Sequence, residues 1–199
     1  MTVFANPIID RRRLTPRESD SVIRILTDAF ASDPVIRWMY PADDTYRVAF
    51  PQFLRAFGGP AFTQGTVVLE RRQRAAALWL APGSGPDDEA IEQCLLETVA
   101  SEKHQDLFAV FSDMEAAHPD FEHWYLPWFG TDPEWQSQGV GSALMQHCLE
   151  AVDDARLPTY LETPNPRNIP FYERQGFELL GRSQHGSCPP VAFMLRPPR

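Results

Sequence analysis

The chain has 199 residues, 43% hydrophobic and 12% aromatic, which suits one folded domain and excludes an intrinsically disordered chain. Its formal net charge of −9 argues against a nucleic-acid partner, because a phosphate backbone requires a basic face. The cysteines Cys94, Cys148 and Cys188 are widely spaced and form no C-x-x-C pair, so they favour reduced thiols in a cytoplasmic protein over a metal or redox site.

The sequence predicts neither a membrane helix nor a signal peptide. No run approaches the roughly 18 apolar residues that a membrane span requires, and the first residues, "MTVFANPIIDRRR", lack a long apolar segment. There is no internal repeat and no linker. We therefore expect one domain over residues 1–199, located in the cytoplasm, with no membrane partner.

A capping box predicts the first helix. Thr15 is the N-cap, Pro16 takes the first helical position and Glu18 reaches back to the cap, after a short strand over residues 11–14. The apolar face of this helix consists of Val22, Ile23, Leu26, Ala29 and Phe30. The segment "SDPVIRWMYPADD" is expected to break it, and a second helix is expected over residues 45–57, ending at "GGP".

Further elements follow from periodicity and from turn residues. Two strands, "GTVVLERR" and "RAAALWLAPG", are joined by a charged turn, and helices are expected near 86–100 and 104–117. A strand over "FEHWYLPWFGTD" is interrupted by Pro127. After a helix that begins near residue 140 come a strand "PTYLET", a helix stopped by Gly176, and two last strands, "FELLGRS" and "PVAFMLRP".

Two glycines, Gly139 and Gly141, stand where the helix near residue 140 begins. A helix N-terminus exposes unpaired N–H groups and the positive end of the helix dipole, and glycine lets an anion approach closely, so the pattern favours phosphate or pyrophosphate. Leu144 occupies the third glycine position of the dinucleotide-binding motif, and there is no P-loop. A simple turn before a core helix is the alternative.

A second group of polar residues lies closer to the C-terminus. Glu162 ends the strand "PTYLET", and Asn168 and Tyr172 are four residues apart, so they share one helix face; Asn165 or Asn168 caps that helix. A phenol has an ordinary pKa near 10 and is able to protonate a strongly basic leaving group such as a thiolate. Ordinary structural roles for Glu162 and Tyr172 are the alternatives.

These two segments resemble the GNAT superfamily of acyl-CoA N-acyltransferases. "QSQGVG" resembles the family motif Q/R-x-x-G-x-G/A, and "NIPFYERQGF" resembles N-x-x-F-Y-x-x-x-G-F, in the family's order and at a fitting separation. The likeness is close over about residues 122–178. The segments "PRNIPFYERQGF" and "AFASDPVIRWMYPADD" are most similar to the puromycin N-acetyltransferase-like group.

The resemblance implies an α/β (α+β) GNAT fold: a mixed central sheet of about six to seven strands flanked by helices. It also implies acetyl-CoA as cosubstrate, with the pyrophosphate held near Gln136 by the backbone of Ser137, Gln138, Gly139, Val140, Gly141 and Ser142. Phe129, Gly130 and Thr131 would pair with pantetheine like an added strand, and one of their N–H groups would polarise the thioester carbonyl. Asn168 or Asn165 would hold the pantetheine arm, and Tyr172 would be the acid. Ser137 and Gln138 depart mildly from the family, which often has glycine and a basic residue there.

An attacking amine needs a base, and two residues are candidates. Glu162 lies beside the tyrosine helix. His123 has a suitable ordinary pKa, and strand alternation places it on one face with Tyr125 and opposite Trp124. A half-buried structural histidine is the alternative for His123. The segment "FSDMEAAHPDFEH" has no metal-ligand spacing, so we expect a solvated helix face and no metal.

The acceptor is the least determined part of the prediction. Phe30, Trp38 and Tyr40 lie where this fold usually admits the substrate, and Tyr125 lies on the strand beside it; ordinary core packing is the alternative. The acidic chain favours a cationic amine by electrostatic steering. We expect acetyl transfer to a primary amine of a small molecule by a monomer or homodimer. The alternatives are a protein or peptide acetyltransferase and a non-catalytic CoA-binding module.

Overall fold

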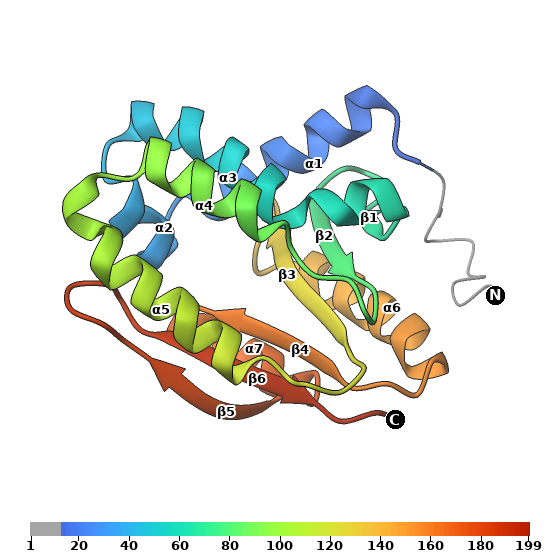
Figure 1. Cartoon of the computed structure of the whole chain (residues 1–199). Coiled ribbons are helices and arrows are strands. Elements are labelled where there is room, and N and C mark those ends of the chain that lie inside the picture. The colour runs from blue at the N-terminus through green and yellow to red at the C-terminus, as the bar shows by residue number, and fades with distance from the viewer. Residues whose placement is uncertain (1–12) are drawn as a thin grey trace.

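The computed structural model describes residues 13–199 and contains a mixed sheet between two groups of helices (Figure 1). Within those residues the sheet has six strands in the order β1 (Val67–Leu69), β2 (Ala75–Leu80), β3 (Trp124–Thr131), β4 (Thr159–Thr163), β6 (Val191–Arg196), β5 (Glu178–Ser183). Only β3 and β4 pair in parallel; the other neighbours are antiparallel. The predicted mixed sheet flanked by helices is confirmed.

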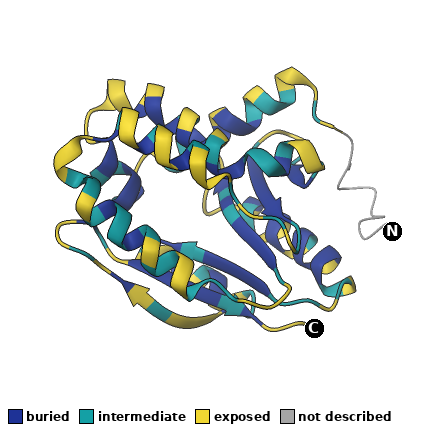
Figure 2. Cartoon of the chain, in the orientation of Figure 1, coloured by how far each residue is buried: buried dark blue, intermediate teal, exposed yellow. Residues whose placement is uncertain are grey.

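The helices cover both faces of this sheet. They are α1 (Pro16–Ala29), α2 (Pro34–Met39), α3 (Asp43–Gln64), α4 (Asp88–Thr98), α5 (His104–Ala117), α6 (Val140–Asp154) and α7 (Ile169–Arg174). Side chains of α1 to α5 form one hydrophobic core, and those of α6 and α7 form the other. Strand β3 contributes alternately to the two cores: Tyr125 and Trp128 to the first, Trp124 and Leu126 to the second. Figure 2 shows most of the sheet buried, with the edge strand β5 and the outer faces of the helices exposed.

The capping box of α1 forms as predicted. The Thr15 hydroxyl accepts from the Glu18 N–H at 3.3 Å, and the Glu18 carboxylate accepts from the Thr15 N–H at 2.8 Å. Of the short strand expected before it, residues 13 and 14 are not in a strand, and residues 11 and 12 lie outside the described residues.

The prediction for residues 32–64 was wrong in two respects. The expected break contains the short helix α2, whose N-cap is Asp33. Helix α3 does not end at "GGP" but runs on to Gln64 and stops at Gly65, with φ of 70°. Gly58 is needed inside α3, because a Cβ there would lie 2.4 Å from Leu78 and 3.1 Å from Trp128. Packing on the sheet therefore overrides the local helix-breaking tendency of these residues.

Strand β3 is continuous through Pro127 rather than interrupted, but its register shifts there. Leu78 pairs with Trp128 and Leu80 with Tyr125, so β3 has one extra residue opposite β2 in this stretch. Proline has no N–H to donate, which suits a bulge. On its other side β3 pairs with β4 only at Trp124 and Tyr125. The later part of β3 is therefore unpaired on the β4 side, and the two parallel strands separate.

In the described part of the chain, no helix is both long enough and apolar enough to cross a membrane.

Candidate active site

Two pockets meet where β3 and β4 separate. The polar pocket lies between the end of β3, the start of α6 and helix α7; the aromatic pocket lies between α2, α3, α5 and the face of β3 that carries Tyr125. Five residues line both: Phe30, Asp33, Phe129, Asn168 and Tyr172. A molecule held in one pocket therefore contacts the same side chains as a molecule held in the other.

The polar pocket is built on the N-terminus of α6. Gly139 is the N-cap, with φ of 80°, a left-handed conformation that glycine adopts without strain, and no side chain of the described residues caps this helix end. Glycine is required at position 141 for a different reason. A Cβ on Gly141 would lie 2.8 Å from the Thr131 hydroxyl, so glycine allows α6 to start close against β3. The first-turn N–H groups of α6 thus face the pocket without side-chain partners.

Most of the residues expected to bind the cosubstrate line this pocket: Phe129, Gly130, Thr131, Gln136, Ser137, Gly139, Gly141, Ser142, Asn165 and Asn168. The side chains of Val140 and Gln138 point elsewhere: Val140 is a core residue, and the Gln138 amide donates to the Glu134 carbonyl at 2.8 Å. Their predicted contribution is that of their backbone N–H groups, which stays a prediction. The Gln136 amide donates to the Thr131 carbonyl at 3.1 Å, which ties the loop before α6 to the end of β3.

The structure separates the two asparagine candidates. The Asn165 side chain caps the short 3₁₀ turn Pro166–Asn168 by accepting from the Arg167 N–H at 3.1 Å. Asn168 is exposed and lines both pockets, whereas Asn165 lines only the polar one. A molecule that extends from one pocket into the other would therefore pass Asn168.

Arg174, the last residue of α7, was not among the predicted site residues. It is exposed, and among the described residues that line the polar pocket it is the only basic one. The sequence offered one indication of this role: Arg174 follows Tyr172 by two residues on the same helix, α7, which begins at the pocket. Arg174 supplies a cation in a pocket whose motif lacks the family's usual basic residue at Gln138.

Tyr172 is buried at the junction of the two pockets. Its ring packs edge-on against Phe171 and Phe177, with centroids 5.2 Å and 5.7 Å away. Burial, and then the nearby charge of Asp33, raise the pKa of its phenol. The hydroxyl makes no hydrogen bond to the described residues, so it is a protonated donor available to the pocket.

Glu162 lines the aromatic pocket at the end of β4. Its side chain is 6% exposed, and its Oε1 atom lies 3.9 Å from His118 Nδ1. The pKa values of Tyr125 and Tyr160 are raised, first by burial and then by the charge of this carboxylate.

His118 was missed by the sequence analysis, which assigned its segment to a solvated helix face. It is the C-cap of α5, and its ring lies edge-on against Tyr125 and Tyr160, 4.9 Å and 4.8 Å between centroids. Glu162 is 44 positions after His118, and no sequence pattern links the two. Tertiary packing alone brings the end of α5 beside Glu162.

His123, a predicted base, lies behind His118 and not in either pocket. Its Nδ1 is 2.7 Å from the Phe121 carbonyl, which only accepts, so Nδ1 carries the proton and Nε2 is free to accept. His118 Nε2 lies 3.0 Å away and must then donate. Burial lowers the pKa of His123, which favours its neutral form, and the Nδ1 atom of His118 faces Glu162.

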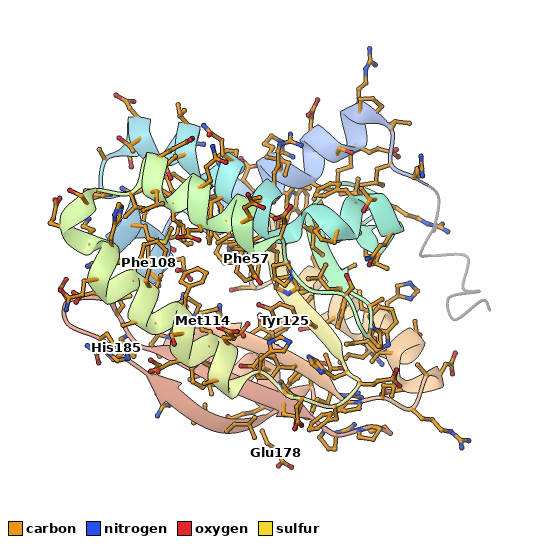
Figure 3. The ribbon with its side chains drawn as sticks, in the orientation of Figure 1. Phe57, Phe108, Met114, Tyr125, Glu178 and His185 are labelled. Atoms are coloured by element: carbon orange, nitrogen blue, oxygen red, sulfur yellow. The ribbon has the colours of Figure 1, made fainter. Side chains whose placement is uncertain are left out.

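The aromatic pocket contains two of the four expected acceptor residues, Phe30 and Tyr125. Trp38 and Tyr40 line neither pocket: the Trp38 indole donates to Ser187 Oγ at 3.2 Å, and the Tyr40 hydroxyl pairs with Thr98 at 2.9 Å. Figure 3 shows Phe57 of α3, Met114 of α5 and Tyr125 of β3 pointing into the same interior space. Phe57 and Met114 were not predicted, because their apolar spacing is that of ordinary core.

Asp33 is a further residue that the sequence analysis did not select. It is 5% exposed and lines both pockets, and burial raises the pKa of its carboxyl to about 6. Among residues 13–199, no three His, Cys, Asp or Glu side chains are arranged so that they could hold a metal ion.

Comparison with known proteins agrees with this geometry. Residues 89–177 match the model of the acetyltransferase (GNAT) family. An uncharacterized N-acetyltransferase of Schizosaccharomyces pombe is 21% identical over 94% of this chain and 83% of its own length.

Solved structures share the fold over nearly the whole chain. A histone acetyltransferase HPA2 and related acetyltransferase from Corynebacterium glutamicum has a TM-score of 0.63 at 23% identity, covering 94% of this chain and 95% of its own. Arylalkylamine N-acetyltransferase 2 from Aedes aegypti has a TM-score of 0.62 at 10% identity, covering 94% and 98%. The fold of this chain is thus the GNAT fold.

Proposed function

We propose that this protein transfers the acetyl group of acetyl-CoA to a primary amine of a small molecule. The observation that carries the proposal is the junction of the two pockets, where a protonated phenol, Tyr172, faces both a helix N-terminus suited to a pyrophosphate and a cavity that contains the carboxylate of Glu162. Members of the family use acetyl-CoA.

The polar pocket fits the cosubstrate. Unpaired N–H groups at the start of α6 and the charge of Arg174 suit the pyrophosphate. The unpaired edge of β3 after Tyr125 leaves N–H and C=O groups for the pantetheine arm, and Asn168 lies along the same path. An N–H of this edge would polarise the thioester carbonyl.

The chemistry needs one base and one acid. The amine nitrogen attacks the thioester carbon, a C–N bond forms and the C–S bond breaks, so an amide and a thiolate result. Glu162 takes the proton that the nitrogen loses, and Tyr172 donates a proton to the thiolate. His118 and then His123 carry the proton from Glu162 toward solvent, since their ring nitrogens form a hydrogen-bonded pair beside the carboxylate.

Release of CoA thiol in the presence of acetyl-CoA and an amine panel tests the function. The panel holds aryl- and alkylamines, puromycin-like amines, polyamines, aminoglycosides and peptides with free lysine or N-terminal amines. Acetylation of small amines in preference to peptides supports the proposal. A preference for peptides would make the protein a peptide acetyltransferase, and CoA binding without any turnover would make it a non-catalytic CoA-binding module.

A further inference from the structure

We propose that the acceptor is a monoamine carried on one aromatic or aliphatic body. It binds as an ammonium ion at Asp33 with its body entering the aromatic pocket, and it loses a proton to Glu162 before it attacks. This inference rests on the proposed function and names the substrate class of the same site.

The walls of the pocket are almost entirely aromatic and aliphatic. The rings of Phe53 and Phe57 contact Trp128 edge-on, with centroids 5.7 Å and 5.8 Å away, and each also contacts Phe111. Met114 adds a polarisable thioether to the same space. Such walls gain free energy by burying an apolar body. The buried indole N–H of Trp128, which has no hydrogen-bond partner in the described structure, is a polar group among these rings.

The two charged side chains of the pocket differ in position: Asp33 lies where the two pockets meet, whereas Glu162 lines the aromatic pocket alone. Among its described lining residues, the only charged side chains are Asp33 and Glu162, and none is basic. An acceptor that carries a carboxylate or phosphate would meet two carboxylates and no cation. An acceptor with several ammonium groups would have to bury the distal ones against phenylalanine rings.

Asp33 has the geometry of a cation site. Its Oδ1 atom accepts from the N–H groups of Val35 and Ile36, both at 3.1 Å, which fixes the carboxylate at the start of α2. Its Oδ2 atom makes no hydrogen bond to any described residue, although the residue is 5% exposed and lines both pockets. A carboxylate oxygen that has no partner in the described structure, on a residue that is otherwise buried and lines the mouth of an apolar cavity, is suited to an ammonium group.

Asp33 is the N-cap of α2, and this role allows a substitution that removes its charge without removing the cap. Asn is as good an N-cap as Asp, so Asp33→Asn keeps the two backbone hydrogen bonds and removes only the charge. Asp87→Asn is the matched control, because Asp87 caps α4 by accepting from the Ala90 N–H at 3.0 Å and lines neither pocket.

The experiment compares acceptor amines that differ in their charged groups. 2-Phenylethylamine has the amine alone, phenylalanine adds a carboxylate, and spermidine replaces the ring by further ammonium groups. We expect kcat/KM to be highest for 2-phenylethylamine or hexylamine. In Asp33→Asn the KM for 2-phenylethylamine should rise on the order of 10–100-fold, as for loss of a charge-assisted contact, while Asp87→Asn keeps the wild-type value.

A binding readout separates this inference from the proposed function. With CoA bound, 2-phenylethylamine should raise the melting temperature more than 2-phenylethanol, and this difference should disappear in Asp33→Asn. Spermidine or phenylalanine as the best acceptor, or an unchanged KM in Asp33→Asn, would overturn the substrate class while acetyl transfer stands. Binding of 2-phenylethylamine without CoA release would overturn the proposed function and leave the amine site in place.

Discussion

The Nε2 atoms of His118 and His123 lie 3.0 Å apart, and the other ring nitrogen of His118 lies 3.9 Å from the carboxylate of Glu162. The two histidines are five residues apart but come from different elements, the end of α5 and the residue before β3. Together they form a path from a buried carboxylate to a partly exposed imidazole.

The first prediction concerns this path. Glu162→Gln should lower kcat/KM by about 10²–10⁴-fold, the usual range for a general base. His118→Ala should lower kcat less, because the carboxylate remains and only proton export is slowed, and added imidazole should restore part of the rate. Steady-state kinetics at several imidazole concentrations check this.

The pH dependence of the reaction rate tests the same proton path. Burial lowers the pKa of His123 from its ordinary 6.5, so His123 becomes protonated, and blocks the path, only below pH 6.5. The wild-type rate should therefore fall on the acid side of that value. His185→Ala serves as the control, since His185 pairs with Asp113 at the surface. Equal rates in wild type, His118→Ala and His123→Ala would exclude the histidine path.

Tyr172→Phe tests the acid. It removes only the hydroxyl, and we expect kcat to fall by about 10²–10⁴-fold with little change in CoA affinity. Because the pKa of Tyr172 is raised, the phenol stays protonated and should cause no loss of activity up to pH 10. Full activity in the variant would assign protonation of the thiolate to water or to another group.

Ser142→Asp tests the helix N-terminus. Ser142 is exposed in the first turn of α6, so an aspartate there favours the helix dipole but repels a pyrophosphate. The variant should melt at or above the wild-type temperature and lose the CoA-induced thermal shift, whereas Ser142→Ala should keep it. Gly141 is unsuitable for this test, because any side chain there meets Thr131. A normal CoA shift in Ser142→Asp would place the pyrophosphate elsewhere.

Arg174→Gln should weaken CoA binding by about two- to fivefold, the range expected for an exposed charge pair worth up to ~1 kcal/mol. The loss should shrink as salt is added, because exposed charges are screened. Titration calorimetry at low and high salt measures both effects. Arg182→Gln, on β5 and outside both pockets, is the control. If the two variants bind CoA equally well, Arg174 has no part in binding.

Asp33→Asn should stabilise the folded protein at neutral pH. The folded-state pKa of Asp33 is raised from 3.8 to about 6, so its contribution to stability is fully present below pH 3.8 and is lost as pH rises through 6. At pH 7 the ionised carboxyl thus costs on the order of 3 kcal/mol, a cost that Asn avoids while it keeps the cap. Denaturant unfolding should show a gain at pH 7.5 that shrinks toward pH 4.5, with no comparable gain in Asp87→Asn. A loss of stability at pH 7.5 would contradict this.

The sequence by itself determined the local elements and the motif that starts α6. Thr15, Pro16 and Glu18 set the start of α1, because a capping box is made by residues that are neighbours in the chain. The glycine at 139 marked the start of α6, since only its own φ and the first turn of the helix are involved. The order of most strands and helices followed from the same short-range patterns, whereas the mixed sheet was implied by the resemblance to the GNAT family.

Only the tertiary structure decided which side chains meet. Helix α3 runs past "GGP" because Gly58 packs against Leu78 and Trp128, contacts that local propensity does not contain. Tertiary packing brings the end of α5, with His118, beside Glu162, and it places Asp33, the N-cap of α2, at the junction of the pockets. Burial then gives Asp33 a pKa that no sequence pattern indicates, because it depends on how much water the surrounding chain excludes.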